Sequence, residues 1–177
     1  PQGVKLERVH TAAEMERAVL AAATRADLVL MAAAVSDYRP IRARKEKIKR
    51  EAATLALELA PNPDILARAA SRRRRGQIFV GFALETSQGL KHAREKLVRK
   101  NLDLVVLNTA ADSLGRATNR VTLVGRRGVE KLPVQMKRDV AEAILDRASQ
   151  LRRGGAGKAS AKAARSRAGR KAARKLR

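Results

Sequence analysis

Apolar residues recur along the chain in two patterns, short continuous runs and longer stretches with a helical period. The continuous runs are residues 27–34, 77–86 and 102–110. Each has the length and composition of a strand that is buried on both faces. Helical spacing occupies residues 10–24, 61–70, 89–101 and 136–151. Because strands alternate with helices, we predict an α/β, Rossmann-like fold with a mostly parallel sheet and helices on both faces.

Three further segments depart from this alternation. Residues 4–9 alternate apolar and polar side chains, which predicts a short strand. Residues 119–134 predict a β-hairpin near the C-terminal end of the fold, with its turn at a pair of glycines. Residues 38–60 form a long connection in which every second residue from 55 to 59 is leucine. We therefore expect a half-exposed strand within a lid-like insertion.

Two predicted helices begin with recognisable caps. Thr11 and Glu14 have the spacing of a capping box, in which each residue satisfies a free N–H at the start of the helix. Asn62 is a good N-cap, Pro63 suits the first helical position and Asp64 complements the helix dipole. The inward-facing residues that the helical spacing predicts are Met15, Val19, Ala22, Leu90, Ala93, Leu97, Val140, Ile144 and Leu151.

Positive charge is concentrated at the C-terminus. The 177 residues carry a formal charge of +23. Eleven Lys or Arg and no acid lie in residues 152–177, which leaves 29 bases against 17 acids, or +12, in the rest. We predict one α/β domain over residues 1–151 and a disordered basic tail over residues 152–177, because the tail has too few large apolar side chains to fold alone. Its charge suits a polyanion such as a nucleic acid.

The composition also narrows the setting in which the protein works. Cysteine is absent, so neither a disulfide framework nor a thiolate metal site can form. No apolar run approaches the roughly 20 residues that a membrane span needs, and the N-terminus lacks the pattern of a signal peptide. We expect a cytoplasmic protein that has no membrane partner.

Polar and aromatic residues follow the predicted strands, at the sheet edge where folds of this class bind ligands. Asp37 can hold a ribose hydroxyl pair or a metal ion, or it can simply form the turn ahead of Pro40. Phe82 either packs on a nucleotide base or closes the core. Residues 62–65 open a helix whose free N–H groups can meet an anion or a base edge, and an ordinary capped helix explains them equally well.

Lysines are the candidate anion ligands. Lys47 and Lys49 are two residues apart, so on an extended segment both ammonium groups lie on one side and suit a phosphate or a carboxylate. Lys96 and Lys100 share one helical face with His92, and a triphosphate can bridge the two lysines. For both pairs the simpler alternative is a solvated run of charge.

Several enzyme signatures are absent from the sequence. The chain has no Ser-His-Asp or Cys-His set, no Walker-type glycine loop and no G-x-G-x-x-G. Its two His residues lack metal-ligand spacing. The residues by themselves therefore predict a nucleotide- or phosphate-handling α/β domain and leave the reaction open.

Six motifs follow one another in order: AAAVSDYRP, KIKR, NPDIL, GFALET, REKLVRKNLDLVVLN and TNRVTLV. Together they resemble phosphopantothenoylcysteine synthetase, the ligase half of the bacterial bifunctional coenzyme A biosynthesis protein, over residues 1–150. The resemblance implies that 4′-phosphopantothenate is joined to L-cysteine at the expense of CTP, with Mg²⁺ as the cation. The carboxylate attacks the α-phosphate to give an acyl-cytidylate and pyrophosphate, and the cysteine amine then displaces CMP.

The resemblance also implies roles for individual residues. Lys47 would assist acyl transfer and contact the nucleotide. Asp37 would face the nucleotide sugar or its metal ion, while Lys96 and Lys100 would bind the triphosphate. The other nucleotide-contacting positions that it implies are Met31, Asn62, Pro63, Asp64, Ile65, Leu66 and Phe82.

The sequence departs from the family pattern at its start. The family's ligase domain begins earlier, with a glycine-rich phosphate loop and an asparagine that handles the acyl intermediate, and neither has a counterpart here. We therefore expect a fragment with impaired activity and a sheet that lacks one or two central strands. The resemblance further implies a homodimer with residues 38–60 near the interface.

Two other functions are compatible with the sequence. A nucleic-acid-binding basic α/β module would draw its affinity from the tail and weaken steeply with salt. An α/β scaffold without any ligand would use the same motifs only for folding. The ligase interpretation requires Asp37, Asn62 and Lys100 to converge on one rim of the sheet.

Overall fold

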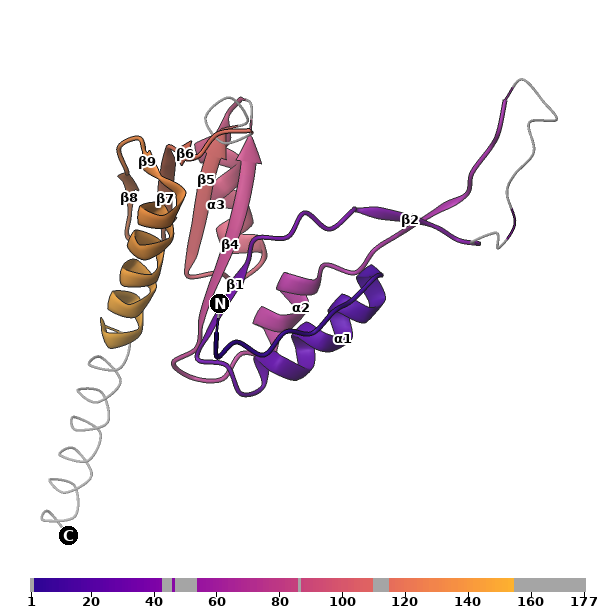
Figure 1. Ribbon diagram of the computed structural model, residues 1–177, viewed down its shortest axis with the longest axis horizontal. Helices are drawn as coiled ribbons and strands as arrows, with labels where there is room; N and C mark the ends of the chain where they lie inside the picture. Colours follow the sequence, from indigo (N-terminus) through magenta and orange to yellow (C-terminus); the bar gives the residue numbers. More distant parts are fainter. Residues whose placement is uncertain (1, 43–45, 47–53, 86, 110–114, 155–177) are drawn as a thin grey trace, which may run out of the picture.

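A computed structural model of the chain describes residues 2–42, 46, 54–85, 87–109 and 115–154 (Figure 1). Its centre is a five-stranded sheet in the order β1-β4-β5-β7-β8. These strands are β1 (Leu28–Met31), β4 (Ile78–Glu85), β5 (Leu104–Thr109), β7 (Val121–Gly125) and β8 (Gly128–Lys131). The three continuous apolar runs of the sequence thus become the three neighbouring strands β1, β4 and β5.

The sheet is parallel on one side and antiparallel on the other. β1, β4 and β5 run parallel, whereas β7 pairs antiparallel with β5 and then turns into β8. The predicted α/β class is confirmed, and so is the predicted hairpin, which turns between Gly125 and Gly128. Because β1, β4 and β5 are parallel, their carboxyl ends meet at one edge of the sheet.

Helices cover both faces, as predicted. α1 (Ala12–Ala23), α2 (Ile65–Ser71) and α3 (Gly89–Arg99) pack on one face, and the helical residues 137–154 pack on the other (Figure 1). Strand alternation divides the side chains between the two cores. Phe79 and Val105 lie in the first, and their neighbours Val80 and Val106 lie in the second.

Two small antiparallel pairs complete the described strands. β6 (Thr118–Asn119) pairs with β9 (Gln135–Met136) beside the hairpin. β2 (Tyr38–Pro40) pairs with β3 (Leu59–Pro61) at the base of an arm that reaches away from the body (Figure 1). The half-exposed strand predicted within residues 38–60 is therefore short, since β3 begins at Leu59, although the carbonyl of Glu58 also accepts from the N–H of Ile41 at 3.0 Å.

Two predictions about strands are wrong. Residues 4–9 are not a strand, because no described strand lies beside them and Val4 and Leu6 stay exposed. β1 is a strand, but it is not covered on both faces. Leu30, which lies beside Val80 in the sheet, is 40% exposed because no described helix covers it.

Most of the residues predicted to face inward from the helices do so. Ala22 and Leu90 are exposed instead of inward-facing, and in α1 the inward positions include Leu20 and Ala23. Thr11 is the N-cap of α1 and accepts from the N–H of Glu14 at 3.1 Å. The Glu14 carboxylate accepts from the N–H of His10 at 2.8 Å, one residue before the cap, and this bond is the main reason that the pKa of Glu14 is lowered.

The C-terminal helix extends past the predicted domain boundary. Residues 152–154 were predicted to belong to the tail, and they are helical. Residues 155–177, on which the prediction of disorder rests, lie outside the described residues. Among the helices of the described ranges, none is long and apolar enough to cross a membrane.

Candidate functional site

A cavity of about 490 Å³ lies at the carboxyl ends of β1 and β4, between the loop that follows β1, the start of α2 and one side of α3. Lys47 lies outside the described residues. Every other predicted nucleotide-contacting position lines this cavity: Met31, Asp37, Asn62, Pro63, Asp64, Ile65, Leu66, Phe82, Lys96 and Lys100. The structure therefore brings together Asp37, Asn62 and Lys100, which lie far apart in the sequence.

Asn62 holds the loop after β1 in place. Its N–H donates to the carbonyl of Asp37 at 2.7 Å, and its Nδ2 donates to the carbonyl of Ser36 at 2.8 Å. Its Oδ1 accepts from Arg39 at 3.2 Å, so the same side chain also ties the base of the arm to this loop. These bonds fix the backbone on which Asp37 stands.

Asp64, and not Asn62, is the N-cap of α2. The carboxylate of Asp64 accepts from the N–H of Ala67 at 3.1 Å, and its backbone is extended with φ −74° and ψ 91°. The prediction placed the cap two residues too early because the Asn62 side chain is already engaged by the loop and by Arg39. The start of α2 is consequently shifted to Ile65.

Asp64 also pairs with Lys100 across the cavity wall. The ammonium of Lys100 lies 2.8 Å from a carboxylate oxygen of Asp64. Burial acts to raise the pKa of Asp64, but the hydrogen bonds from Lys100 and from the N–H of Ala67 outweigh it, so the pKa lies below its usual value. This pair joins the start of α2 to the end of α3 and orients one of the two lysines.

Lys96 has no such carboxylate partner. Its ammonium donates to the carbonyl of Phe82 at 2.5 Å, and no ion pair of Lys96 is found within the described chain. Burial lowers the pKa of Lys96, and the positive charge of Lys100 lowers it further, while Asp64 and Glu85 act more weakly in the opposite direction. The wall formed by α3 therefore presents a poorly compensated cation to the cavity.

His92 does not join the two lysines in the cavity. Its Nδ1 lies 2.9 Å from a carboxylate oxygen of Glu85, at the end of β4. Phe82 combines both of the roles considered for it, since it lines the cavity and packs against the second hydrophobic core. The aromatic ring is thus half-buried at the boundary between core and site.

Asp37 is the candidate ligand for a cation. Its carboxylate has neither a hydrogen bond nor an ion pair to any described residue, and no group of three His, Cys, Asp or Glu side chains suited to a metal occurs there. Mg²⁺ is usually held by one or two carboxylates together with water and substrate phosphates. The carboxylate of Asp37 is a group of the kind that can hold such an ion.

Sequence reasoning missed several residues of the lining. The loop after β1 contributes Ala32, Ala33 and Ala34, and Leu84 follows Phe82 along β4. The run of alanines was a usable signal, because side chains without bulk let a ligand approach the backbone closely. Arg39 does not line the cavity, but it bonds to Asn62, and the sequence carried no signal of this, since its contacts with Asn62 and with the carbonyl of Pro61 depend on the pairing of β2 with β3.

The sequence matches the family model of the DNA/pantothenate metabolism flavoprotein C-terminal domain over residues 1–151. The coenzyme A biosynthesis bifunctional protein CoaBC of Vibrio cholerae is 38% identical over 150 residues, which cover 82% of this chain and 38% of the relative. A protein named cysteine/cysteine sulfinic acid decarboxylase, from an unknown prokaryotic organism, is 36% identical over 148 residues, covering 81% and 41%. The chain thus spans about two fifths of the length of these relatives.

Solved structures agree with this match. The crystal structure of the C-terminal domain of CoaBC superposes with a TM-score of 0.68 at 31% identity, covering 83% of this chain and 65% of the other. A Cab2 mutant in complex with phosphopantothenate-cysteine shares the fold, with a TM-score of 0.66 at 22% identity and coverage of 86% and 54%.

Proposed function

We propose a function for this chain from the premise that it belongs to the family of the DNA/pantothenate metabolism flavoprotein C-terminal domain. In the proposal, the domain belongs to a coenzyme A biosynthesis enzyme and performs the CTP-dependent ligation of 4′-phosphopantothenate to L-cysteine. Its relatives include bifunctional coenzyme A biosynthesis proteins. The observation that carries the proposal is the convergence of Asp37, the start of α2 and two lysines on one cavity.

The lysines suit the triphosphate of the nucleotide. In the proposed first step an anionic carboxylate attacks an anionic phosphate, so the site has to compensate negative charge before the two can meet. Lys96 supplies a half-buried positive charge that pairs with no carboxylate of the described residues, and Lys100 lies one helical turn away. Mg²⁺ bound to the phosphates, with Asp37 as a ligand, would polarise the phosphoryl oxygens.

The start of α2 suits the cytosine base. Asp64 accepts from the N–H of Ala67, and within the described ranges no hydrogen bond uses the N–H groups of Ile65 and Leu66. Both residues line the cavity. Backbone donors and acceptors at fixed positions can recognise the edge of a base, because a buried polar group left unpaired with the wrong base costs about 1–3 kcal/mol.

Two displacement steps make up the proposed reaction. A carboxylate oxygen of phosphopantothenate bonds to the α-phosphorus of CTP while the bond to the leaving pyrophosphate breaks. The amine of cysteine then attacks the acyl carbon, CMP leaves, and the amine gives up a proton as the amide forms. We propose Lys47, which lies outside the described residues, as the residue that assists this acyl transfer.

The proposal extends to the assembly and its location. We propose a cytoplasmic homodimer in which the arm around β2 and β3 lies near the second copy. Leu55, Leu57 and Leu59 support this, because they are 58%, 60% and 52% exposed on a segment that reaches away from the body (Figure 1). A cluster of exposed leucines gains free energy when it is covered by protein.

A chimera tests the proposed reaction. Residues 1–151 would replace the matching segment of the Vibrio cholerae relative, and the readouts would be pyrophosphate release and formation of the amide from phosphopantothenate, cysteine and CTP. We expect the chimera to form product and to prefer CTP over ATP. The Lys47→Gln chimera should bind CTP and should lose at least about a hundredfold in kcat, which corresponds to about 2.7 kcal/mol of transition-state stabilisation.

The controls separate folding from chemistry. The unaltered Vibrio cholerae protein serves as the positive control, and the circular dichroism of both chimeras reports folding. A folded chimera that binds CTP without forming product would contradict the proposal, and so would wild-type turnover in the Lys47→Gln chimera.

A further inference from the structure

A second cavity, of about 550 Å³, lies at the opposite end of the sheet, where β4 and β5 begin. Its walls come from the loop of residues 72–77, from the turn between β7 and β8, and from the end of the C-terminal helix. The charged residues of the lining are Arg73, Arg74, Arg75, Arg126, Arg127, Arg147 and Asp103. Six arginines against one aspartate give the lining a formal charge of +5.

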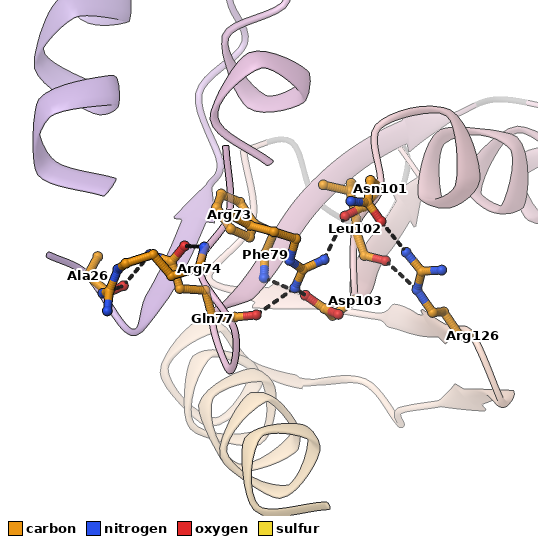
Figure 2. A network of polar contacts seen from close by, with 9 residues as sticks. All are labelled: Ala26, Arg73, Arg74, Gln77, Phe79, Asn101, Leu102, Asp103 and Arg126. Carbon is orange, nitrogen blue, oxygen red and sulfur yellow. Dashed lines mark hydrogen bonds and ion pairs between the residues drawn. The ribbon is translucent and has the colours of Figure 1, made fainter. Parts of the chain in front are cut away.

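Two of these arginines build the wall (Figure 2). Arg73 forms an ion pair with Asp103 and donates to the carbonyl of Asn101 at 3.0 Å, with its guanidinium 5.2 Å from the centre of the Phe79 ring. Arg126 donates to the carbonyl of Leu102 at 3.1 Å and to Oδ1 of Asn101 at 2.7 Å. Both side chains therefore anchor the connection between α3 and β5.

The loop that carries the consecutive arginines is held from the other side (Figure 2). The buried Gln77 donates to the carbonyl of Ala26 at 2.6 Å and accepts from the N–H of Arg74 at 2.5 Å. Gln77 also donates to the carbonyl of Ala23 at 2.7 Å. Arg74 also donates to the carbonyl of Ala26 at 3.1 Å. The loop is thus fixed to the end of α1, and Arg73 and Arg74 are held in place by these contacts.

Arg75 and Arg127 do not anchor any neighbouring segment. Both are exposed, and neither makes a hydrogen bond or an ion pair with any other described residue. They line the same cavity from two different segments, the loop 72–77 and the β7–β8 turn. Guanidinium groups that are gathered without acidic partners lower their free energy when an anion such as phosphate binds between them.

We propose that this arginine-lined cavity docks the backbone phosphates of duplex nucleic acid. A single small anion would engage one or two of the guanidinium groups, whereas the regularly spaced phosphates of a duplex can engage several at once. The lining includes Gly154, and the residues that follow it in the sequence, 155–177, hold nine Lys or Arg and no acid. The basic part of the sequence therefore begins directly after the last residue of the lining.

The lining also indicates which nucleic acid fits. The described residues that line the cavity include no aromatic side chain, and the whole chain has one Tyr and two Phe. Single strands are bound largely by stacking their bases on aromatic rings, which this surface cannot offer. Contacts to phosphate alone predict binding that is independent of sequence, favours duplex over single strand and weakens steeply with salt.

Fluorescence anisotropy of the full chain with a labelled duplex DNA of 20 base pairs tests this proposal. The variant Arg75→Ser with Arg127→Ser removes two phosphate contacts, so the slope of log affinity against log salt should fall in magnitude by about 1.8, at about 0.9 per contact. We expect at least about tenfold weaker binding at 0.1 M salt. The pair Arg8→Ser with Arg17→Ser is the matched control, because it removes the same charge outside the cavity.

Further variants and ligands distinguish the possible explanations of a loss of binding. Arg75→Lys with Arg127→Lys keeps both charges and should lose less affinity than the serine pair, while circular dichroism confirms that every variant is folded. Equal duplex affinity in the cavity variant and the control would overturn the proposal, because the tail alone would then carry the binding. An equal loss on phosphatidylcholine/phosphatidylserine vesicles, or tighter binding of the single strand, would overturn the assignment to duplex.

Discussion

The lysine-lined cavity at the carboxyl ends of β1 and β4 depends on Lys96 for its electrostatics. The positive charge of Lys96 is half-buried and lies next to Lys100, and among the described residues its ammonium donates to the carbonyl of Phe82 without forming an ion pair. Burial without a compensating anion disfavours the charged form, which is why its pKa is lowered. A bound phosphate would supply the missing negative charge and raise that pKa, so binding of the nucleotide and protonation of Lys96 are linked.

We predict a pH dependence of CTP affinity from this linkage. Below the lowered pKa of Lys96 the lysine is already charged, and its protonation does not change the affinity. As pH rises through that pKa, binding has to take up a proton, so affinity falls by up to about tenfold per pH unit until the pKa of the complex is passed. Calorimetry without Mg²⁺ between about pH 8 and 10.5, above the titration of the phosphate groups, would measure the fall.

Lys96→Met is the control for this prediction. The variant should bind CTP more weakly, by about 1.5–3 kcal/mol for a lost charge-assisted contact, and its affinity should be flatter across the same pH range. An identical pH profile in the wild type and the variant would show that Lys96 does not titrate with binding.

At the scale of elements, the site depends on how closely α2 approaches β4. A Cβ added to Gly81 would lie 2.8 Å from a methyl carbon of Leu102 and 3.0 Å from one of Leu66. Leu66 belongs to α2, is buried and also lines the cavity. The absence of a side chain at position 81 therefore allows the close packing of helix and strand that positions the start of α2.

Gly81→Ala is predicted to disturb both packing and binding. Overpacking of this kind costs about 1–3 kcal/mol in the free energy of unfolding, and CTP affinity should fall because α2 shifts. Gly128→Ala is the matched control, since a Cβ there meets nothing within 4 Å. Urea unfolding would measure the free energies. Equal stability of the two variants would rule out a tight contact at position 81.

The elements also show how far sequence could predict the fold. The runs that became β1, β4 and β5 were readable because their apolar character is local. The strand expected at residues 4–9 failed because a strand needs a neighbour, which local alternation cannot reveal. The prediction of Asn62 as an N-cap failed for a similar reason. The local sequence favoured it as the cap of the following helix, but its side chain bonds to Ser36 and Arg39, which lie more than twenty residues away.

At the scale of the whole molecule, the sheet separates two cavities. The carboxyl ends of β1 and β4 carry the lysine-lined cavity proposed for CTP, and the beginnings of β4 and β5 carry the arginine-lined cavity. The first was predictable, because strand ends are expected ligand sites and its motifs follow the strands. The second was not, because its arginines come from three segments that only the fold brings together. The net charge of the chain indicated an anionic partner without showing where it binds.

The central claim is that the lysine-lined cavity binds CTP, and isothermal titration calorimetry of the full chain tests it most directly. We predict that CTP with Mg²⁺ binds one site per chain and that ATP binds more weakly. The variant Lys96→Ala with Lys100→Ala should lose at least about a hundredfold in affinity, at about 1.5–3 kcal/mol for each charge-assisted contact. Undetectable CTP binding by the folded wild-type chain, or unchanged affinity in the double variant, would contradict the claim.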